Sequence, residues 1–382
     1  MNRRRFLTIV GGGTVLAATA ATTGFLTTRT PHKALQPWHD AGILYDEPRR
    51  KALSYALLAP NPHNRQPWQV DLSKPNELTL YADTERLLPH TDPFGRQITI
   101  GLGCFLELMV MAAAVDGNKV ELQLFSQGFD NSVIDERPVA RAIFTEDKGL
   151  TADPLFRFVK ERRSNKEPYD TSKPVAEADL EPIQRSVRNG GTFGSSLDSG
   201  HIAKLRKLTS EALMIEIETP HTYKESVDLF RIGRAEIEQN PDGIDFSGPF
   251  FESLALAGLF NREVVMDTSS TSYKQGIAAQ MDTTNSAMGH VWLTSAGNTR
   301  IDQIKAGRDW VRLNLAATMQ GIAMQPLSQA LQEYPEMAGH FQKVHKMLAP
   351  EGDTVQMLAR IGYGQSISES PRWGLETRIM KV

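Results

Sequence analysis

Four side chains that suit a phosphate group lie within five residues in the segment ERRSNKEPYD, residues 161–170. Arg162 and Arg163 can each offer two parallel hydrogen bonds to an oxyanion, Ser164 adds a hydroxyl, and Lys166 adds a point charge. Basic runs of this length more often form a solvated surface. The cluster is therefore a candidate phosphate site, and a solvated surface remains the alternative.

A second unusual stretch is APNPHNRQPW, residues 59–68. Three prolines and two asparagines in ten residues predict a turn-forming loop, because proline and asparagine favour turns over regular helix or strand. A loop that also carries a histidine, an arginine, a glutamine and a tryptophan is a candidate for holding a ligand. On the residues alone, the ligand is open.

Two apolar segments would position these loops. ITIGLGCFLELMVMAAAVDG (98–117) and RDWVRLNLAATMQG (308–321) are apolar on nearly all sides, which predicts buried helices. Each ends in two alanines followed by a glycine that suits a helix C-terminus, and each leads to a strand-like run, VELQLF or IAMQPL. The match is short enough to arise by chance, but it indicates two similar halves packed through their central helices.

Length and charge limit the class of protein. At 382 residues, the chain is long enough for two packed units. The net charge is −3, and four arginines give the first thirty residues +4, so the remainder carries −7. Nucleic-acid binding requires a basic face, so nucleic acid is not expected as a partner.

The N-terminus, residues 1–30, reads as a signal peptide. A basic start is followed by an apolar stretch rich in glycine, alanine and threonine, and Arg3, Arg4 and Arg5 precede Phe6 and Leu7 in the manner of a twin-arginine export signal. We expect export by the twin-arginine machinery to the periplasm, with an uncleaved membrane anchor as the alternative. The single Cys104 excludes an internal disulfide and fits a core position.

Taken together, these motifs resemble the flavin-dependent nitroreductase superfamily. PNPHNRQPW is similar to its asparagine loop, RRSNK to its phosphate motif, and IGYG followed by Ser370-Pro371-Arg372 to its C-terminal segment. The export signal and the pattern DPFGRQ…GCFLEL resemble the Acg-type branch, whose single chain carries two nitroreductase-like halves. The resemblance covers most of residues 45–380.

The resemblance implies an α+β fold, a nitroreductase-like α/β/α sandwich in which two fused halves, residues 31–153 and 154–382, form a pseudo-dimer. It also implies one flavin mononucleotide (FMN) between the halves. The second half keeps the phosphate motif, but SVRNGGTFGSS (186–196) lacks the Gln-Pro-Trp of the asparagine loop, so only one composite site is expected. Residues 221–285 form an excursion with no counterpart in the first half, read either as a lid or as a plain helical insertion.

The resemblance also implies roles for individual residues. Arg162, Ser164 and Arg372 would hold the FMN phosphate, and Lys166 would lie near the N1/O2 edge of the ring. Asn61, His63 and Asn64 would wrap the ring and ribityl chain, with Gln66 and Trp68 bracing the loop. His63 is equally well read as a residue that braces the loop. The candidate FMN-binding residues are Asn61, His63, Asn64, Gln66, Arg162, Arg163, Ser164, Lys166, Pro326, Leu327, Ser328, Gln329 and Arg372.

Other chemistries fit poorly. GLGCFL lacks the last glycine of a dinucleotide-binding loop, the chain has no GxSxG, Walker A or HExxH motif, and its histidines show no metal-ligand spacing. We therefore expect a monomeric FMN-dependent oxidoreductase that passes hydride or electrons through flavin N5 to a small organic acceptor. The alternative is an FMN-binding protein that sequesters the cofactor without turnover. No metal is expected.

Overall fold

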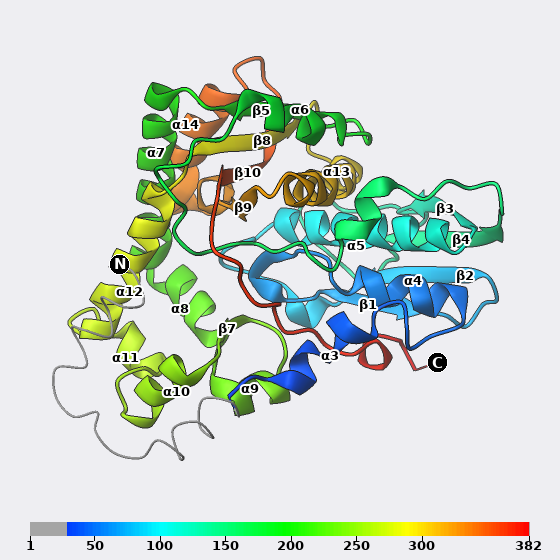
Figure 1. The fold of residues 1–382 in the computed structure, drawn as a ribbon, viewed down its shortest axis with the longest axis horizontal. Helices are drawn as coiled ribbons and strands as arrows, with labels where there is room; N and C mark the ends of the chain where they lie inside the picture. Colours follow the sequence, from blue (N-terminus) through cyan, green and yellow to red (C-terminus); the bar gives the residue numbers. More distant parts are fainter. Residues whose placement is uncertain (1–28, 382) are drawn as a thin grey trace.

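Two four-stranded antiparallel sheets lie on opposite sides of a pair of long helices in the computed structural model, which describes residues 29–381 (Figure 1). The strand orders are β1-β2-β4-β3 and β5-β8-β10-β9, so each strand of one sheet has a counterpart in the other. The first sheet contains β1 (Trp68–Asp71), β2 (Glu77–Ala82), β3 (Asn118–Leu124) and β4 (Ala140–Glu146). The second contains β5 (Thr192–Ser196), β8 (Gly289–Ser295), β9 (Ala323–Pro326) and β10 (Thr354–Gly362).

The two central helices repeat one another. Helix α5 (Arg96–Val115) and helix α13 (Arg300–Met319) each have 20 residues and occupy the same place between the second and third strands of their sheets. They cross where Gly103 meets Gly307, and a Cβ at either position would overlap a backbone carbonyl oxygen of the other helix. The predicted α+β class, with two similar halves packed through their central helices, is confirmed.

The ends of these helices follow from their capping residues. Gly117 and Gly321 lie just beyond the last turns with φ of +67° and +68°, as predicted for helix-terminating glycines. The apolar pattern placed the start of the second helix at residue 308, which is wrong. Helix α13 begins eight residues earlier because Thr299 and Asp302 form a capping box at Arg300.

Most of the remaining helices surround this core. Helix α4 packs on α5, while α7 and α14 contact the second sheet. Helix α5 is long and apolar enough to cross a membrane, but in the folded chain it is buried between the halves. These outer helices are α3 (His32–Asp40), α4 (Pro48–Ala56), α6 (Glu177–Arg185), α7 (Ser199–Glu218) and α14 (Ala338–Leu348). Short 3-10 turns are η2 (Thr84–Arg86), η3 (Pro154–Phe158), η5 (Pro335–Met337) and η6 (Leu375–Thr377).

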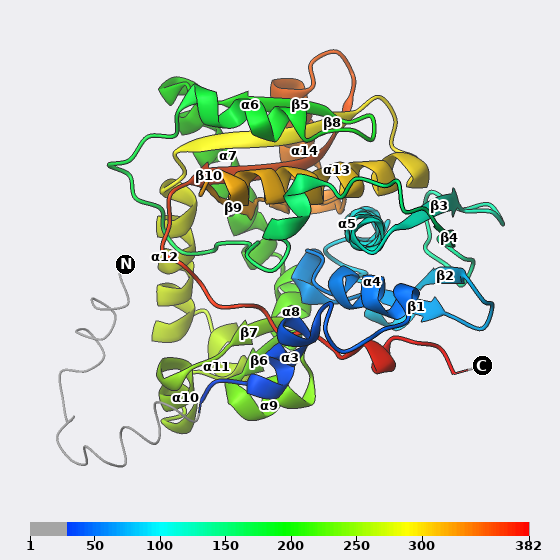
Figure 2. The same cartoon turned by 45° about the vertical axis from the view of Figure 1, so that its right-hand side comes forward.

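The excursion forms a lobe of its own, at the lower left in both ribbon views (Figures 1 and 2). It has its own small apolar cluster, in which the Phe246 ring contacts Phe230, Phe251 and Phe260. The lobe contains α8 (Pro220–Asp228), α9 (Gly233–Gln239), α10 (Pro249–Leu256), α11 (Arg262–Met266), α12 (Thr271–Asn285), and the parallel pair β6 (Phe230–Ile232) and β7 (Ile244–Phe246).

The C-terminal segment leaves the second sheet and crosses to the first half (Figure 2). Beside β1, Val70 donates its backbone N–H to Arg378 (2.9 Å) and accepts one from Met380 (2.8 Å). This crossing carries Arg372 to the first half, where its N–H bonds to the Ala34 carbonyl (2.8 Å). Residues 1–28 of the expected signal segment lie outside the described residues.

Candidate functional site

The loop at residues 59–66 has an unusual backbone. Around the 3-10 turn η1 (Pro62–Asn64), residues His63, Asn64 and Gln66 have φ of 47°, 50° and 51°. Left-handed conformations of this kind are uncommon outside glycine and tend to cluster at functional sites. The Asn61 carboxamide oxygen holds the loop closed by accepting the Gln66 N–H (2.7 Å).

Residues from both halves of the chain hold the loop in place. The fully buried Trp68 ring packs against Phe105 of α5, with ring centroids 4.9 Å apart. The Gln66 side chain, also fully buried, donates to the Pro241 carbonyl (2.7 Å) and accepts the Trp373 N–H (2.9 Å). Gln66 and Trp68 therefore fix the loop rather than present themselves to a ligand.

Two buried arginines meet at the turn before this loop. Arg372 donates to the Leu57 carbonyl (2.8 Å) and to the Asn64 side-chain oxygen (2.7 Å). Arg162 donates to the Leu58 carbonyl (3.3 Å) through one nitrogen, while its Nε and Nη1 are buried without a partner among residues 29–381. Each side chain comes from the second half of the chain and ends against a turn of the first half.

Among the described residues, no carboxylate forms a direct ion pair with either guanidinium. Burial, followed by the Arg163 charge, lowers the pKa of Arg162 to about 10. Burial, followed by the Arg162 charge, lowers the pKa of Arg372 to about 9. Both groups remain protonated at neutral pH, and a buried charge without a partner costs several kcal/mol. Two adjacent buried cations, one of which has two unpartnered donors, therefore indicate a site for an anion such as phosphate.

The rest of the basic cluster is placed differently. Arg163 forms an ion pair with Glu369 (2.5 Å), and its guanidinium lies over the Trp38 ring (4.7 Å to the centroid). Its charge is therefore already neutralised by a carboxylate of the chain. Ser164 is half-buried beside the two arginines in the chain, and Lys166 is exposed. The structure thus brings Arg162 and Arg372 together, and it engages Arg163 elsewhere.

His63 is held as a neutral ring. Burial lowers its pKa to about 4, and the charges of Lys166 and Arg65 act in the same direction. Its Nδ1 is buried and has no hydrogen-bond partner in the part of the chain that the structure describes. A nitrogen without a partner is available to a ligand, which favours contact with a bound ring over bracing of the loop.

The segment Pro326–Gln329 begins at the last residue of β9 and continues into the 3-10 turn η4 (Gln329–Leu331). The Leu327 N–H bonds to the Leu358 carbonyl (2.8 Å), and Ser328 accepts the Leu331 N–H (2.9 Å). Two residues before Pro326, Met324 accepts the Asn165 N–H (3.0 Å), which ties β9 to the basic cluster. The segment therefore lies next to the element that carries Lys166.

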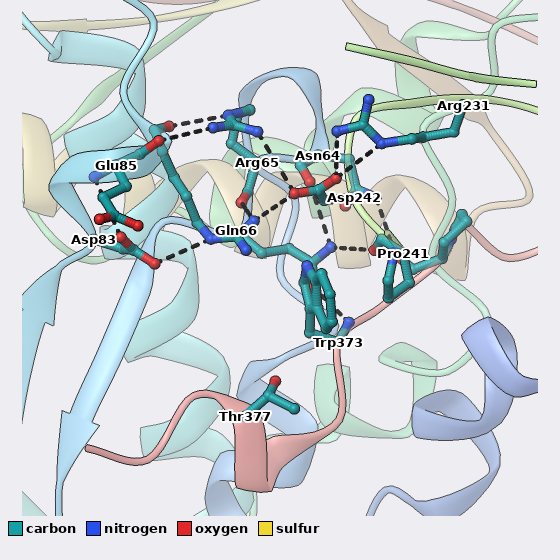
Figure 3. A network of polar contacts seen from close by, with 12 residues as sticks. Asn64, Arg65, Gln66, Asp83, Glu85, Arg231, Pro241, Asp242, Trp373 and Thr377 are labelled. Atoms are coloured by element: carbon teal, nitrogen blue, oxygen red, sulfur yellow. Dashed lines mark hydrogen bonds and ion pairs between the residues drawn. The ribbon is translucent and has the colours of Figure 1, made fainter. Parts of the chain in front are cut away.

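One functional feature was missed from the sequence. The buried Asp242 carboxylate of the excursion binds Arg65, Arg86 and Arg231, at 3.5, 2.5 and 2.8 Å (Figure 3). Next to it, the Gly243 N–H bonds to the Asn64 carbonyl (3.3 Å). The excursion is therefore fastened to the loop. The turn-rich NPDG was visible in the sequence, but its three arginine partners come from separate segments.

The equivalent loop of the second half is filled by the protein itself. Asp309 of α13, fully buried, accepts the backbone N–H groups of Arg188 (2.8 Å), Asn189 (2.8 Å) and Gly191 (3.0 Å). Nearby, Arg312 binds the carboxylates of Glu107 (2.9 Å) and Asp153 (2.7 Å). Here carboxylates of the chain satisfy the donors, whereas the donors of Arg162 remain open.

No model of a protein family matches the chain. The chain is 23% identical over 322 residues to the Mycobacterium tuberculosis protein named "Putative NAD(P)H nitroreductase Rv3131", covering 82% of this chain and 84% of that protein. A second M. tuberculosis protein, named "Putative NAD(P)H nitroreductase acg", is 30% identical over 122 residues, which are 32% of this chain and 37% of that protein. The solved FMN-dependent nitroreductase NfnB from Mycobacterium smegmatis, in complex with NADPH, aligns with a TM-score of 0.35 and 18% identity, over 58% of this chain and 94% of that chain.

Proposed function

We propose that this chain is an FMN-dependent oxidoreductase of the nitroreductase superfamily that passes hydride or electrons to a small organic acceptor. Similarity to a nitroreductase-named relative over most of both chains supports the superfamily. The observation that most supports FMN is the pair of buried arginines at the junction of the two halves, Arg162 and Arg372, of which Arg162 has two guanidinium nitrogens without a hydrogen-bond partner among the described residues. A phosphate group would supply the missing negative charge.

The residues present fit FMN. Arg162 and Arg372 would hold the phosphate with Ser164, while the strained loop would present Asn61, His63 and Asn64 to the ring and ribityl chain. Bound FMN would supply the two-electron chemistry of flavin N5. The exposed Lys166 would place a positive charge where the reduced ring gathers negative charge, which favours reduction.

Turnover is tested by reoxidation of the bound flavin. The protein is loaded with FMN, reduced anaerobically with dithionite, and mixed with a p-quinone or a nitroaromatic compound in a stopped-flow instrument. An oxidoreductase of this type returns the flavin absorbance at about 10 per second, a usual enzyme turnover rate. Reoxidation no faster than that of free reduced FMN would exclude catalysis. NADH and NADPH, tested separately as reductants, identify the donor.

A second candidate is a protein that stores FMN without turnover. The attachment of the excursion to the loop through Asp242 and three arginines favours it, because a fastened cover would hinder access to a bound ring. The same stopped-flow experiment separates the two candidates, since a storage protein would retain bound FMN and show no acceptor-dependent reoxidation.

We further propose that the chain is a monomer exported to the periplasm by the twin-arginine machinery, with FMN bound before export. The Arg3-Arg4-Arg5-Phe6-Leu7 sequence motivates this. Replacing Arg3 and Arg4 with lysine should retain the FMN-loaded protein in the cytoplasm. Unchanged export in a cell-fractionation experiment would rule out this route.

A further inference from the structure

A carboxylate of the excursion lies within electrostatic range of Arg372. Gly243 immediately precedes β7 and donates its N–H to the Asn64 carbonyl (3.3 Å), and the Asn64 side chain in turn accepts from Arg372 (2.7 Å). Asp245 lies two residues further along β7 and is only partly accessible. Its charge and that of Arg372 act on one another. Asp245 therefore lies on the strand that follows the contact with Asn64, within electrostatic range of one of the two arginines proposed to hold the phosphate.

The other acceptors around the arginines are neutral. Arg372 bonds to backbone carbonyls, the Ser370 hydroxyl and the Asn64 amide, and Arg162 bonds to the Leu58 carbonyl. Asp242 is close by, but three arginines already neutralise it. Asp245 is thus the carboxylate of the excursion whose charge remains to act on Arg372 and Lys166.

We propose that Asp245 is an internal counter-ion of the anion site, which competes with the phosphate of an incoming ligand. This inference rests on the proposed function only in naming FMN as that ligand. Two negative groups cannot share the site at low cost, because like charges in a buried setting repel strongly. Phosphate binding therefore requires Asp245 to move away or to take up a proton.

The direction of the pH effect follows from the charges. Burial raises the pKa of Asp245, although the charges of Lys166 and Arg372 oppose the shift. A bound phosphate would raise it further, so FMN should bind more tightly as the pH falls and Asp245 becomes neutral. The other groups that face Asp245 do not produce this effect. His63 is neutral above its pKa of about 4, and Arg162 and Arg372, with pKa values of about 10 and about 9, stay charged near neutral pH. Arg231, opposite Asp245 on β6, and Lys166 are the other cations near this carboxylate.

The experiment measures the dissociation constants of FMN and riboflavin by fluorescence titration between pH 6 and pH 8. The proteins are the full chain, Asp245→Asn, and Asp228→Asn as a control on an exposed carboxylate of the same lobe that pairs with Lys224. At pH 7.5, Asp245→Asn should bind FMN about tenfold more tightly, within the range typical of coupling between two sites. Riboflavin, which lacks the phosphate, should bind the parent and Asp245→Asn alike, and Asp228→Asn should match the parent.

The parent protein alone provides a second reading if the variant does not fold. Its preference for FMN over riboflavin should increase as the pH falls from 7.5 to 6. The second ionisation of a phosphate monoester, near pH 6, works in the opposite direction. A constant or falling preference would overturn the proposal, as would unchanged FMN affinity in Asp245→Asn. If no protein binds FMN or riboflavin, the cofactor assignment itself is wrong.

Discussion

Arg162 and Arg372 are where the account can be tested one side chain at a time. Replacing either with alanine removes a charged donor to the phosphate, which contributes about 1.5–3 kcal/mol, so FMN affinity should fall by about 10–100-fold. Arg185, an exposed arginine of α6 paired with Glu181, is the matched control, and Arg185→Ala should bind FMN like the parent. The measurement is FMN fluorescence titration.

Arg162→Ala should affect the stability of the FMN-free protein differently from its affinity for FMN. Since Arg162 is a buried cation with two unpartnered nitrogens, its loss should not lower the unfolding free energy without FMN. A merely structural arginine would show the reverse pattern, with a large loss of stability and unchanged FMN affinity. Urea unfolding with and without FMN separates the two.

For individual residues, the sequence identified candidate ligand-binding side chains but could not show which of them are buried together. The run Arg162–Lys166 was compatible with a solvated surface, and its composition could not decide otherwise. Burial of Arg162 beside Arg372, some two hundred residues later in the chain, is a tertiary fact that favours the ligand site. The pairing of Asp242 with Arg65, Arg86 and Arg231 was equally inaccessible, because no local rule selects among many arginines.

The close crossing of α5 and α13 predicts that a side chain at Gly103 destabilises the fold. A methyl group at Gly103 would overlap the Ile304 carbonyl oxygen, which is backbone and cannot turn aside. Gly103→Ala should therefore lower the unfolding free energy by about 1–3 kcal/mol, as overpacking does. Urea unfolding is the measurement.

Gly276 of α12 is the control for this substitution. No heavy atom lies within 4 Å of a Cβ added there. Gly276→Ala should be neutral or stabilise by up to about 1 kcal/mol, because alanine is the better helix former. Equal effects at Gly103 and Gly276 would contradict the close helix crossing.

The elements were predicted where local signals were strong. The apolar runs and the terminal glycines located both central helices. The early start of α13 had a readable signal that was overlooked, Thr299 followed by Asp302 three positions later, a capping-box pattern. The excursion was harder, because its elements are short and glycines with positive φ, such as Gly233 and Gly248, interrupt it.

Across the whole molecule, the two halves share one arrangement of sheets and helices, but the two junctions between them differ. The sheets share a strand order and the central helices share their length and crossing glycines. One junction leaves arginine donors open, and the other is closed by Asp309 and by the carboxylates bound to Arg312. The missing Gln-Pro-Trp indicated the loss of the second site. The sequence could not predict that Asp309 would bind the backbone of the equivalent loop. Asp309 belongs to a helix, and the loop lies more than a hundred residues earlier in the chain.

This asymmetry makes cofactor stoichiometry the most direct test. The purified chain is saturated with FMN and freed of excess ligand. Its molar mass is measured by light scattering, and the flavin is counted by absorbance after denaturation. The account predicts a monomer with one FMN per chain. A ratio near two, no retained FMN, or a homodimer with its flavin between chains would contradict the claim that two halves of one chain build a single site.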